Sequence, residues 1–170
     1  NLGLPEARHY LTELISALIA ESGVTCYRQD FNFQPAPYWQ AADPPDRVGM
    51  SEIRHIEGLY TLWDELLSTN PNLVIDNCAS GGRRIDLETV SRSVVLWRTD
   101  YNYFEPNGYQ CHTYGISLYL PSTSTGSGYP EIYSFRSSIN SGVVLDWNPF
   151  QPEITSLRTL PFQADIGEPV

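Results

Sequence analysis

Apolar residues in the first part of the chain recur at a helical spacing and then give way to a strand-like run. Between Pro5 and Gly23 one apolar stripe repeats about every 3.6 residues, which predicts a helix over 5–22. The stripe consists of Leu11, Leu14, Ile15, Leu18 and Ile19. Gly23 ends the helix, and the β-branched and aromatic residues of 24–30 predict a strand.

The same cycle repeats after a proline-rich interval. Residues 33–50 contain four prolines and few periodic apolar positions, which predicts a long loop. Ser51 caps a predicted helix over 51–68, and a strand over 73–77 follows. Shorter elements then alternate, with helices predicted over 85–92, 107–116 and 131–140 and strands over 94–97, 117–120 and 143–145. Such alternation is typical of an α/β chain with a parallel sheet.

The alternation stops near residue 150. Residues 151–170 contain three prolines and no clear period, so we interpret them as a tail or linker after one domain over 1–150. An alternating α/β chain forms either an open doubly wound sheet or a barrel, and a complete (β/α)₈ barrel needs about 200 residues or more. Because the chain has 170 residues and starts at Asn1 without a leader pattern, we expect it to be part of a longer protein.

Charge and composition exclude several classes of partner. The net charge is −10, and all ten basic residues other than histidine are arginines. Nucleic acids and anionic membranes need basic patches, so we expect neither as a partner. No apolar run is long enough to span a bilayer. The three cysteines and three histidines have no metal-ligand spacing, so we predict no metal and no cofactor.

Two aspartates that follow predicted strands are the candidates for catalysis. Asp30 ends the strand over 24–30, and Arg28, two residues earlier, lies on the same strand face, where its charge favours an ionised carboxylate. Asp100 follows the strand over 94–97, and aromatic neighbours there favour a desolvated carboxyl group. A capping or structural role is an equal alternative for each aspartate. Two facing carboxyl groups are also typical of a glycosidase.

Two segments rich in small residues follow other predicted strands. The segment 78–86 lacks the Lys-Ser/Thr pair of a phosphate loop and has only part of the GxGxxG spacing, so we interpret it as a tight turn from strand to helix. The segment 121–128 is composed mainly of serine, threonine and glycine, and we expect a loop that lines the mouth of the sheet.

Taken together, these motifs resemble glycoside hydrolase family 36, the melibiase-type α-galactosidases, over about residues 5–148. Residues 28–32 resemble the family's nucleophile motif, and 78–86 its Cys-x-x-Gly-x-x-Arg-x-Asp motif. The pair Leu96-Trp97 before Asp100 resembles the segment that carries the acid/base. Residues 114–121 and 141–146 resemble the seventh and eighth strand segments. The resemblance implies a partial (β/α)₈ TIM barrel, about strands 4 to 8.

The resemblance also implies a role for each candidate residue. Asp30 corresponds to the nucleophile and Asp100 to the acid/base of a retaining hydrolase acting on α-galactosides. The sugar-binding residues that it implies are Arg28, Asn32, Cys78, Gly81, Arg84 and Trp97. Two positions depart from well-known members. Arg28-Gln29 replaces Lys-Trp before the nucleophile, and Tyr101 replaces an aspartate after the acid/base.

Other functions fit the same motifs. An α-N-acetylgalactosaminidase or a galactosyl transferase would use the same scaffold with a different pocket. A third alternative is a catalytically incomplete barrel fragment that only folds and self-associates. Open edges of a parallel sheet would then join copies of the chain into a homo-oligomer. A carbohydrate is the expected substrate in the enzymatic alternatives.

Overall fold

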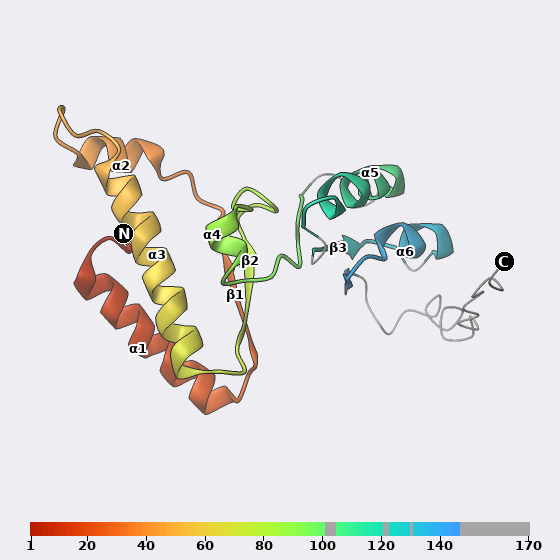
Figure 1. Ribbon diagram of the computed structural model, residues 1–170, viewed down its shortest axis with the longest axis horizontal. Coiled ribbons are helices and arrows are strands. Elements are labelled where there is room, and N and C mark those ends of the chain that lie inside the picture. The colour runs from red at the N-terminus through yellow and green to blue at the C-terminus, as the bar shows by residue number, and fades with distance from the viewer. Residues whose placement is uncertain (101–104, 121–122, 130, 147–170) are drawn as a thin grey trace. The chain divides into compact units, whose positions relative to one another are not determined.

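The computed structural model describes residues 1–100, 105–120, 123–129 and 131–146 (Figure 1). The chain divides into two compact units, Asn1–Asp100 and Tyr101–Val170. The predicted single domain over 1–150 stays a prediction, and the predicted tail over 151–170 lies outside the described residues. Within the described part of the chain, no helix combines the length and apolar character needed to cross a membrane.

The first unit alternates helices with two parallel strands. Its elements are α1 (Pro5–Ser22), β1 (Cys26–Asp30), α2 (Ala36–Ala42), α3 (Met50–Thr69), β2 (Val74–Cys78) and α4 (Leu87–Val90). Strands β1 and β2 pair in parallel with Arg28 opposite Asp76 and Asp30 opposite Cys78. The carboxyl ends of the two strands therefore lie side by side, which confirms the predicted parallel α/β arrangement in this unit.

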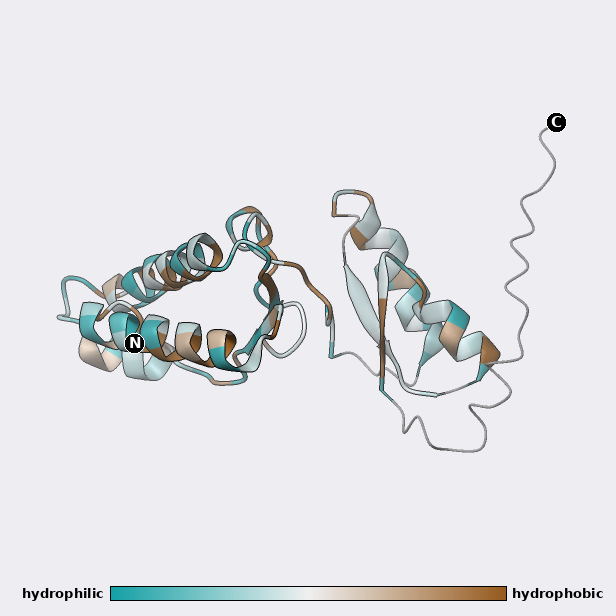
Figure 2. Ribbon diagram, turned by 90° about the horizontal axis from the view of Figure 1, so that it is seen from below, coloured by the Kyte–Doolittle hydropathy of each residue, from teal (hydrophilic) through white to brown (hydrophobic). Residues whose placement is uncertain are grey.

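Helices α1 and α3 pack against each other and enclose the apolar core of the first unit. Figure 2 shows brown apolar bands recurring among teal polar bands along the helices of this unit. The buried core residues are Leu2, Ile19, Leu59, Leu62, Trp63, Leu66, Leu73 and Ile75. Gly23 ends α1 in the left-handed region at φ 69°, with its N–H bonded to the Ile19 carbonyl, as the sequence predicts.

Three predictions for the first unit need correction. The interval predicted as a loop contains helix α2, because Pro35 is its N-cap residue and Pro37 lies in its first turn, where a missing N–H is tolerated. The predicted strand over 94–97 is reduced to a bridge, in which Val94 pairs in parallel with Asp76 beside β2. The predicted helix over 85–92 is also shorter, since α4 spans four residues behind an Asp86–Thr89 capping box.

The second unit repeats the pattern with shorter elements. They are α5 (Pro106–Ser117), β3 (Ser124–Ser127), α6 (Ile132–Ser138) and β4 (Gly142–Leu145), and β3 pairs with β4 in parallel. Helix α6 packs on β3, where the Ser138 hydroxyl donates to the Gly126 carbonyl at 3.2 Å.

The predicted strand over 117–120 is wrong. Helix α5 extends through Ser117, and the next residues, Leu118 and Tyr119, are exposed. The strand lies instead in the segment predicted as a mouth loop. That strand is buried although its residues are serine, threonine and glycine. A search for apolar periodicity misses such a strand, because none of its side chains is apolar. Its burial comes from neighbouring elements that cover its hydroxyl and backbone groups.

Candidate active site

The carboxyl ends of β1 and β2 bring four polar side chains onto one face of the sheet. Side chains two residues apart on a strand share a face, so Arg28 and Asp30 lie beside Asp76 and Cys78 on the partner strand. Cys78 and Asp76 are buried, whereas the side chain of Asp30 is 33% exposed. The site is therefore open at Asp30 and closed below it.

Asp30 is surrounded by groups that stabilise its anionic form. Partial burial of Asp30 opposes its ionisation, but the carboxylate accepts hydrogen bonds from the Cys78 thiol and the Asn32 side chain. A hydrogen bond with the backbone of Ser80 and the charge of Arg28, whose Nη2 lies 3.5 Å from Oδ2, act in the same direction. The net result is a pKa of the Asp30 carboxyl below its usual value.

The tight turn after β2 connects Asp30 with the segment that carries Asp100. Ser80 and Gly81 both adopt positive φ, and the Asn32 amide oxygen accepts from the Ser80 N–H at 2.9 Å. Gly81 bridges Thr99 in an antiparallel sense. A Cβ at Gly81 would lie 2.5 Å from the backbone nitrogen of Asp100. The structure requires glycine at position 81 both because φ is 75° and because the backbone of Asp100 leaves no room for a Cβ.

Asp100 lies at the surface beside that turn. The residue is exposed, and its Oδ1 accepts a hydrogen bond from Trp97 Nε1 at 3.0 Å. The sequence led us to expect aromatic neighbours that desolvate Asp100, but the described aromatic neighbour donates a hydrogen bond and leaves the carboxyl group open to water. Tyr101, the next aromatic residue, lies outside the described residues.

Arg84 lies on the other face of the two strands and ties their ends together. Its Nε donates to Asn77 Oδ1 at 2.7 Å, and its Nη2 donates to the backbone carbonyls of Gln29 and Cys78. The guanidinium also lies 5.2 Å from the centre of the Trp63 ring. Burial lowers the pKa of Arg84 from its ordinary value. These contacts give Arg84 a structural part that sequence reasoning did not predict.

Trp63 and Asp76 are supporting residues that sequence reasoning missed. Trp63 Nε1 donates to Gln29 Oε1 at 2.6 Å, which fixes the middle of β1 against α3. Asp76 is 3% exposed and pairs with Arg28. A charged residue within an otherwise apolar predicted strand was the available signal for Asp76, because such a residue is buried only when it has a partner.

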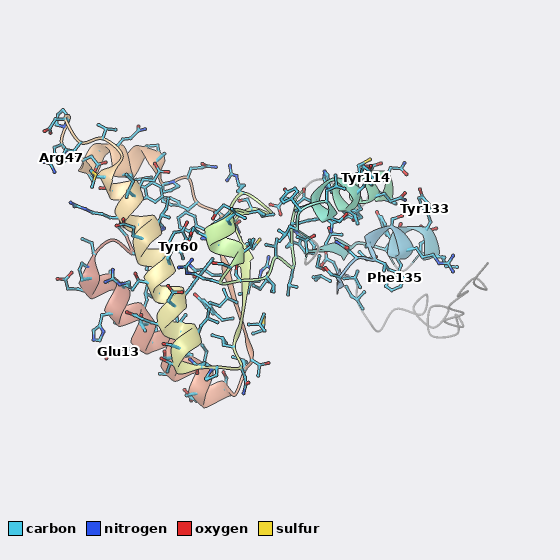
Figure 3. The ribbon with its side chains drawn as sticks, viewed as in Figure 1. Glu13, Arg47, Tyr60, Tyr114, Tyr133 and Phe135 are labelled. Carbon is cyan, nitrogen blue, oxygen red and sulfur yellow. The ribbon has the colours of Figure 1, made fainter. Side chains whose placement is uncertain are left out.

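A hollow of ≈340 Å³ lies on the helix-facing side of this region, and neither Asp30 nor Asp100 lines it. Phe31 and Ala79, which follow the two strands, contribute to its wall together with α2 and α3. Tyr60, a further lining residue, projects from α3 on the side of α4, where the Arg92 guanidinium lies 4.9 Å from its ring centre (Figure 3).

The structure thus gathers most of the predicted site around the Ser80–Gly81 turn. The predicted residues that meet there are Arg28, Asp30, Asn32, Cys78, Gly81, Trp97 and Asp100. Arg84 is the exception, because its described contacts are with the opposite strand face. An ionised aspartate and a second, solvent-accessible aspartate flanking one turn are the chemical groups that a two-carboxylate hydrolase needs.

The sequence of the chain matches the melibiase family model over residues 1–129, and the chain belongs to this family. Among curated relatives, α-galactosidase AgaA of Geobacillus stearothermophilus is 29% identical over 118 residues, which are 69% of this chain and 16% of that protein. The α-galactosidase of Escherichia coli is 31% identical over 102 residues, covering 60% of this chain and 14% of that protein. The chain therefore spans about a sixth of the length of these relatives.

Solved structures show the same fold. The α-galactosidase of Lactobacillus brevis matches 92% of this chain and 22% of its own, with a TM-score of 0.76 and 20% identity. A variant of the GH36 α-galactosidase AgaA from Geobacillus stearothermophilus in complex with stachyose matches with a TM-score of 0.75 and 20% identity, over 92% of this chain and 23% of its own.

Proposed function

We propose that the chain carries the two catalytic aspartates of a retaining glycoside hydrolase that acts on α-galactosides. Its elements would be strands 4 to 8 of a (β/α)₈ barrel with their helices. The supporting observation is the environment of Asp30, whose carboxylate is held in its anionic form beside the turn that packs on Asp100. Membership of the melibiase family and the α-galactosidase relatives support the substrate class.

In this proposal Asp30 attacks the anomeric carbon of the galactoside. The bond from that carbon to the leaving oxygen breaks while Asp100 donates its proton to that oxygen, and a covalent galactosyl ester forms on Asp30. Asp100, now a carboxylate, then takes a proton from water. The resulting nucleophile attacks the same carbon, breaks the ester and restores both aspartates. The product keeps the configuration of the substrate.

The other site residues divide between the sugar and the scaffold. Arg28, Asn32, Cys78 and Gly81 would line the sugar side of the pocket, since they surround the open carboxylate of Asp30. Trp97 would orient Asp100 through its indole N–H. Arg84 would reach the substrate only from the far side of the strand ends, where it braces the backbone.

Trapping the covalent intermediate tests this assignment. A 2-fluorinated galactosyl donor with a good leaving group slows the second step, so the ester accumulates. We expect mass spectrometry of the protein produced from its complete gene to locate the label on Asp30, and Asp30→Asn to abolish labelling. A label on Asp100 or on another residue would contradict the assignment.

A further inference from the structure

Asp76 is a buried charge that the proposed reaction does not use. It lies in the middle of β2, two residues before Cys78, and 3% of its surface is exposed. Removing a carboxylate from water costs several kcal/mol unless partners compensate, and a buried ion pair is often no more stabilising than apolar residues of the same volume. Stability alone is therefore a weak reason for an aspartate at this position.

The two oxygens of Asp76 bind groups that belong to different halves of the candidate site. Oδ2 pairs with Nη1 of Arg28, and the other nitrogen of that guanidinium, Nη2, faces Asp30 at 3.5 Å. Oδ1 accepts from the backbone N–H of Leu96 at 3.1 Å, at the start of the segment that leads to Trp97 and Asp100. One carboxylate thus contacts the strand of Asp30 and the segment of Asp100.

Each half also has contacts of its own, and Asp76 adds one further contact to each. The side chain of Arg28 is 41% exposed, and an exposed ion pair such as Arg28–Asp30 contributes only about 0–1 kcal/mol. The segment after Val94 forms a bridge rather than a strand, so a regular ladder does not fix Leu96. The carboxylate of Asp76, held on a buried strand position, gives each half one charge-assisted hydrogen bond.

We propose that Asp76 is a positioning residue that orients Arg28 toward Asp30 and at the same time fixes the segment leading to Asp100. The consequence for chemistry rests on the proposed function, but the contacts themselves do not. Asp76 acts through Arg28 and through the Leu96 backbone, and it does not contact the reacting atoms in this arrangement.

Hydrogen-exchange and NMR measurements on the chain test both attachments. Each oxygen of Asp76 accepts a hydrogen bond from one donor. An asparagine side chain has one acceptor oxygen and an NH₂ group, so Asp76→Asn loses one of the two contacts. We expect hydrogen exchange at the Leu96 amide to accelerate at least about tenfold relative to a core amide such as Leu62. We expect the Nη signals of Arg28, which are separate while its guanidinium is held, to become averaged in NMR spectra of Asp76→Asn because Arg28 is released. Asp76→Glu should recover much of both.

The matched control is Asp64→Asn, which removes an aspartate that pairs with Arg92 at 2.8 Å but is 55% exposed and far along the sequence from both attachments. It should change neither readout. Unchanged Leu96 exchange in Asp76→Asn, or Arg28 Nη signals that stay separate in that variant, would overturn the proposal.

A measurement on the unmutated chain applies if Asp76→Asn does not fold. We expect the Arg28 guanidinium to give separate, slowly exchanging Nη signals, while exposed Arg47 (labelled in Figure 3) gives averaged ones. Averaged Arg28 signals would overturn the proposal. If the protein hydrolyses no α-galactoside but these readouts behave as expected, the proposed function fails and the positioning role stands.

Discussion

Asp30 and Asp100 have the same side chain, and their neighbours give them different chemistry. Asp30 accepts hydrogen bonds from three directions and lies near a guanidinium, which suits an anionic nucleophile. Asp100 has one described donor, the Trp97 indole, and is open to solvent, which suits a group that exchanges protons with a leaving oxygen and with water.

Removing Asn32 should raise the pKa of Asp30. The Asn32 side chain donates to the Asp30 carboxylate and also holds the Ser80 backbone, so Asn32→Ala weakens the stabilisation of the anion from two sides. The pKa of Asp30 rises because loss of hydrogen-bond donors to a carboxylate favours its protonated form. Carboxyl ¹³C NMR of Asp30 against pH measures the shift. Asn72→Ala, in the exposed turn before β2, is the control and should leave the pKa of Asp30 unchanged.

Replacing each aspartate by alanine should give azide products of opposite configuration. With an aryl α-galactoside of low leaving-group pKa, Asp100→Ala still forms the covalent ester, and azide then displaces Asp30 to give the α-galactosyl azide. Asp30→Ala lacks the nucleophile, so azide attacks directly and gives the β-galactosyl azide. NMR of the products, made with the protein from its complete gene, distinguishes them. The same anomer from both variants would contradict the division of roles.

At the scale of elements, turns position the site rather than the strands alone. The Ser80–Gly81 turn and the helix cap at Gly23 both need positive φ, but only the former is packed against another backbone. Comparing the two glycines separates the cost of the backbone conformation from the cost of the contact.

Gly81→Ala should destabilise the first unit much more than Gly23→Ala. Both substitutions place a Cβ in the left-handed region, at a cost of about 1–2 kcal/mol. At Gly23 nothing lies within 4 Å of the new Cβ, whereas at Gly81 it meets backbone atoms of Thr99 and Asp100 at 2.5–2.8 Å. We expect Gly81→Ala to cost about 3 kcal/mol or more. Urea unfolding measures both, and equal losses would show that the 98–100 segment moves freely.

His55 should make the packing of the amino-terminal residues on α3 sensitive to acid. Burial, followed by the charges of the α-amino group and Arg84, lowers the pKa of His55 to about 4. Its Nδ1 accepts from the Leu2 backbone N–H at 3.3 Å, a bond that protonation at that atom would break. The folded pKa is below the unfolded one, so this stability is present above pH 6.5 and is lost as pH falls toward 4.

The loss attributable to His55 is at most about 3 kcal/mol across that interval, and solvent screening of the half-buried ring reduces it. Urea unfolding at pH 7 and at pH 4.5 gives the change, and His55→Gln serves as the comparison because a neutral amide does not titrate. We expect the variant to lose less stability than the unmutated chain between the two pH values. An equal loss would place the acid sensitivity in other groups.

At the scale of the whole molecule, the chain presents apolar surface along with sheet edges. The exposed apolar residues of α1 and its cap are Leu4, Tyr10, Leu14 and Leu18. Among the described residues β1 pairs with β2 alone, and its other edge has no strand beside it. Edges and apolar faces of this kind favour pairing with another chain.

We predict that the 170-residue chain by itself self-associates and hydrolyses aryl α-galactosides slowly or not at all. Light scattering on a size-exclusion column measures the first, and release of the phenolate measures the second. Leu14→Lys combined with Leu18→Lys should reduce association without unfolding, since both side chains are exposed by 40% or more. A monomer with full turnover would contradict both parts.

Local patterns in the sequence were enough to predict the long elements and most residues of the candidate site. The apolar period of α1 and α3 and the β-branched run of β1 each depend on neighbours within a few residues, so they can be recognised without the fold. The motifs around Asp30, Cys78 and Asp100 likewise identified the residues that the Ser80–Gly81 turn assembles. Periodicity failed where local signals were weak, as at the hydroxyl-rich strand β3.

The tertiary structure decided on which face of the β1–β2 sheet each side chain makes its contacts. Arg84 stands in a motif beside Cys78, yet it braces the far side of the strands, because the turn at Ser80–Gly81 reverses the chain with positive φ. Asp76 gains its partners from β1 and from the backbone of Leu96, which are 48 and 20 residues away in sequence. Such contacts depend on strand register and on a turn of several residues, and a window of neighbouring residues contains neither.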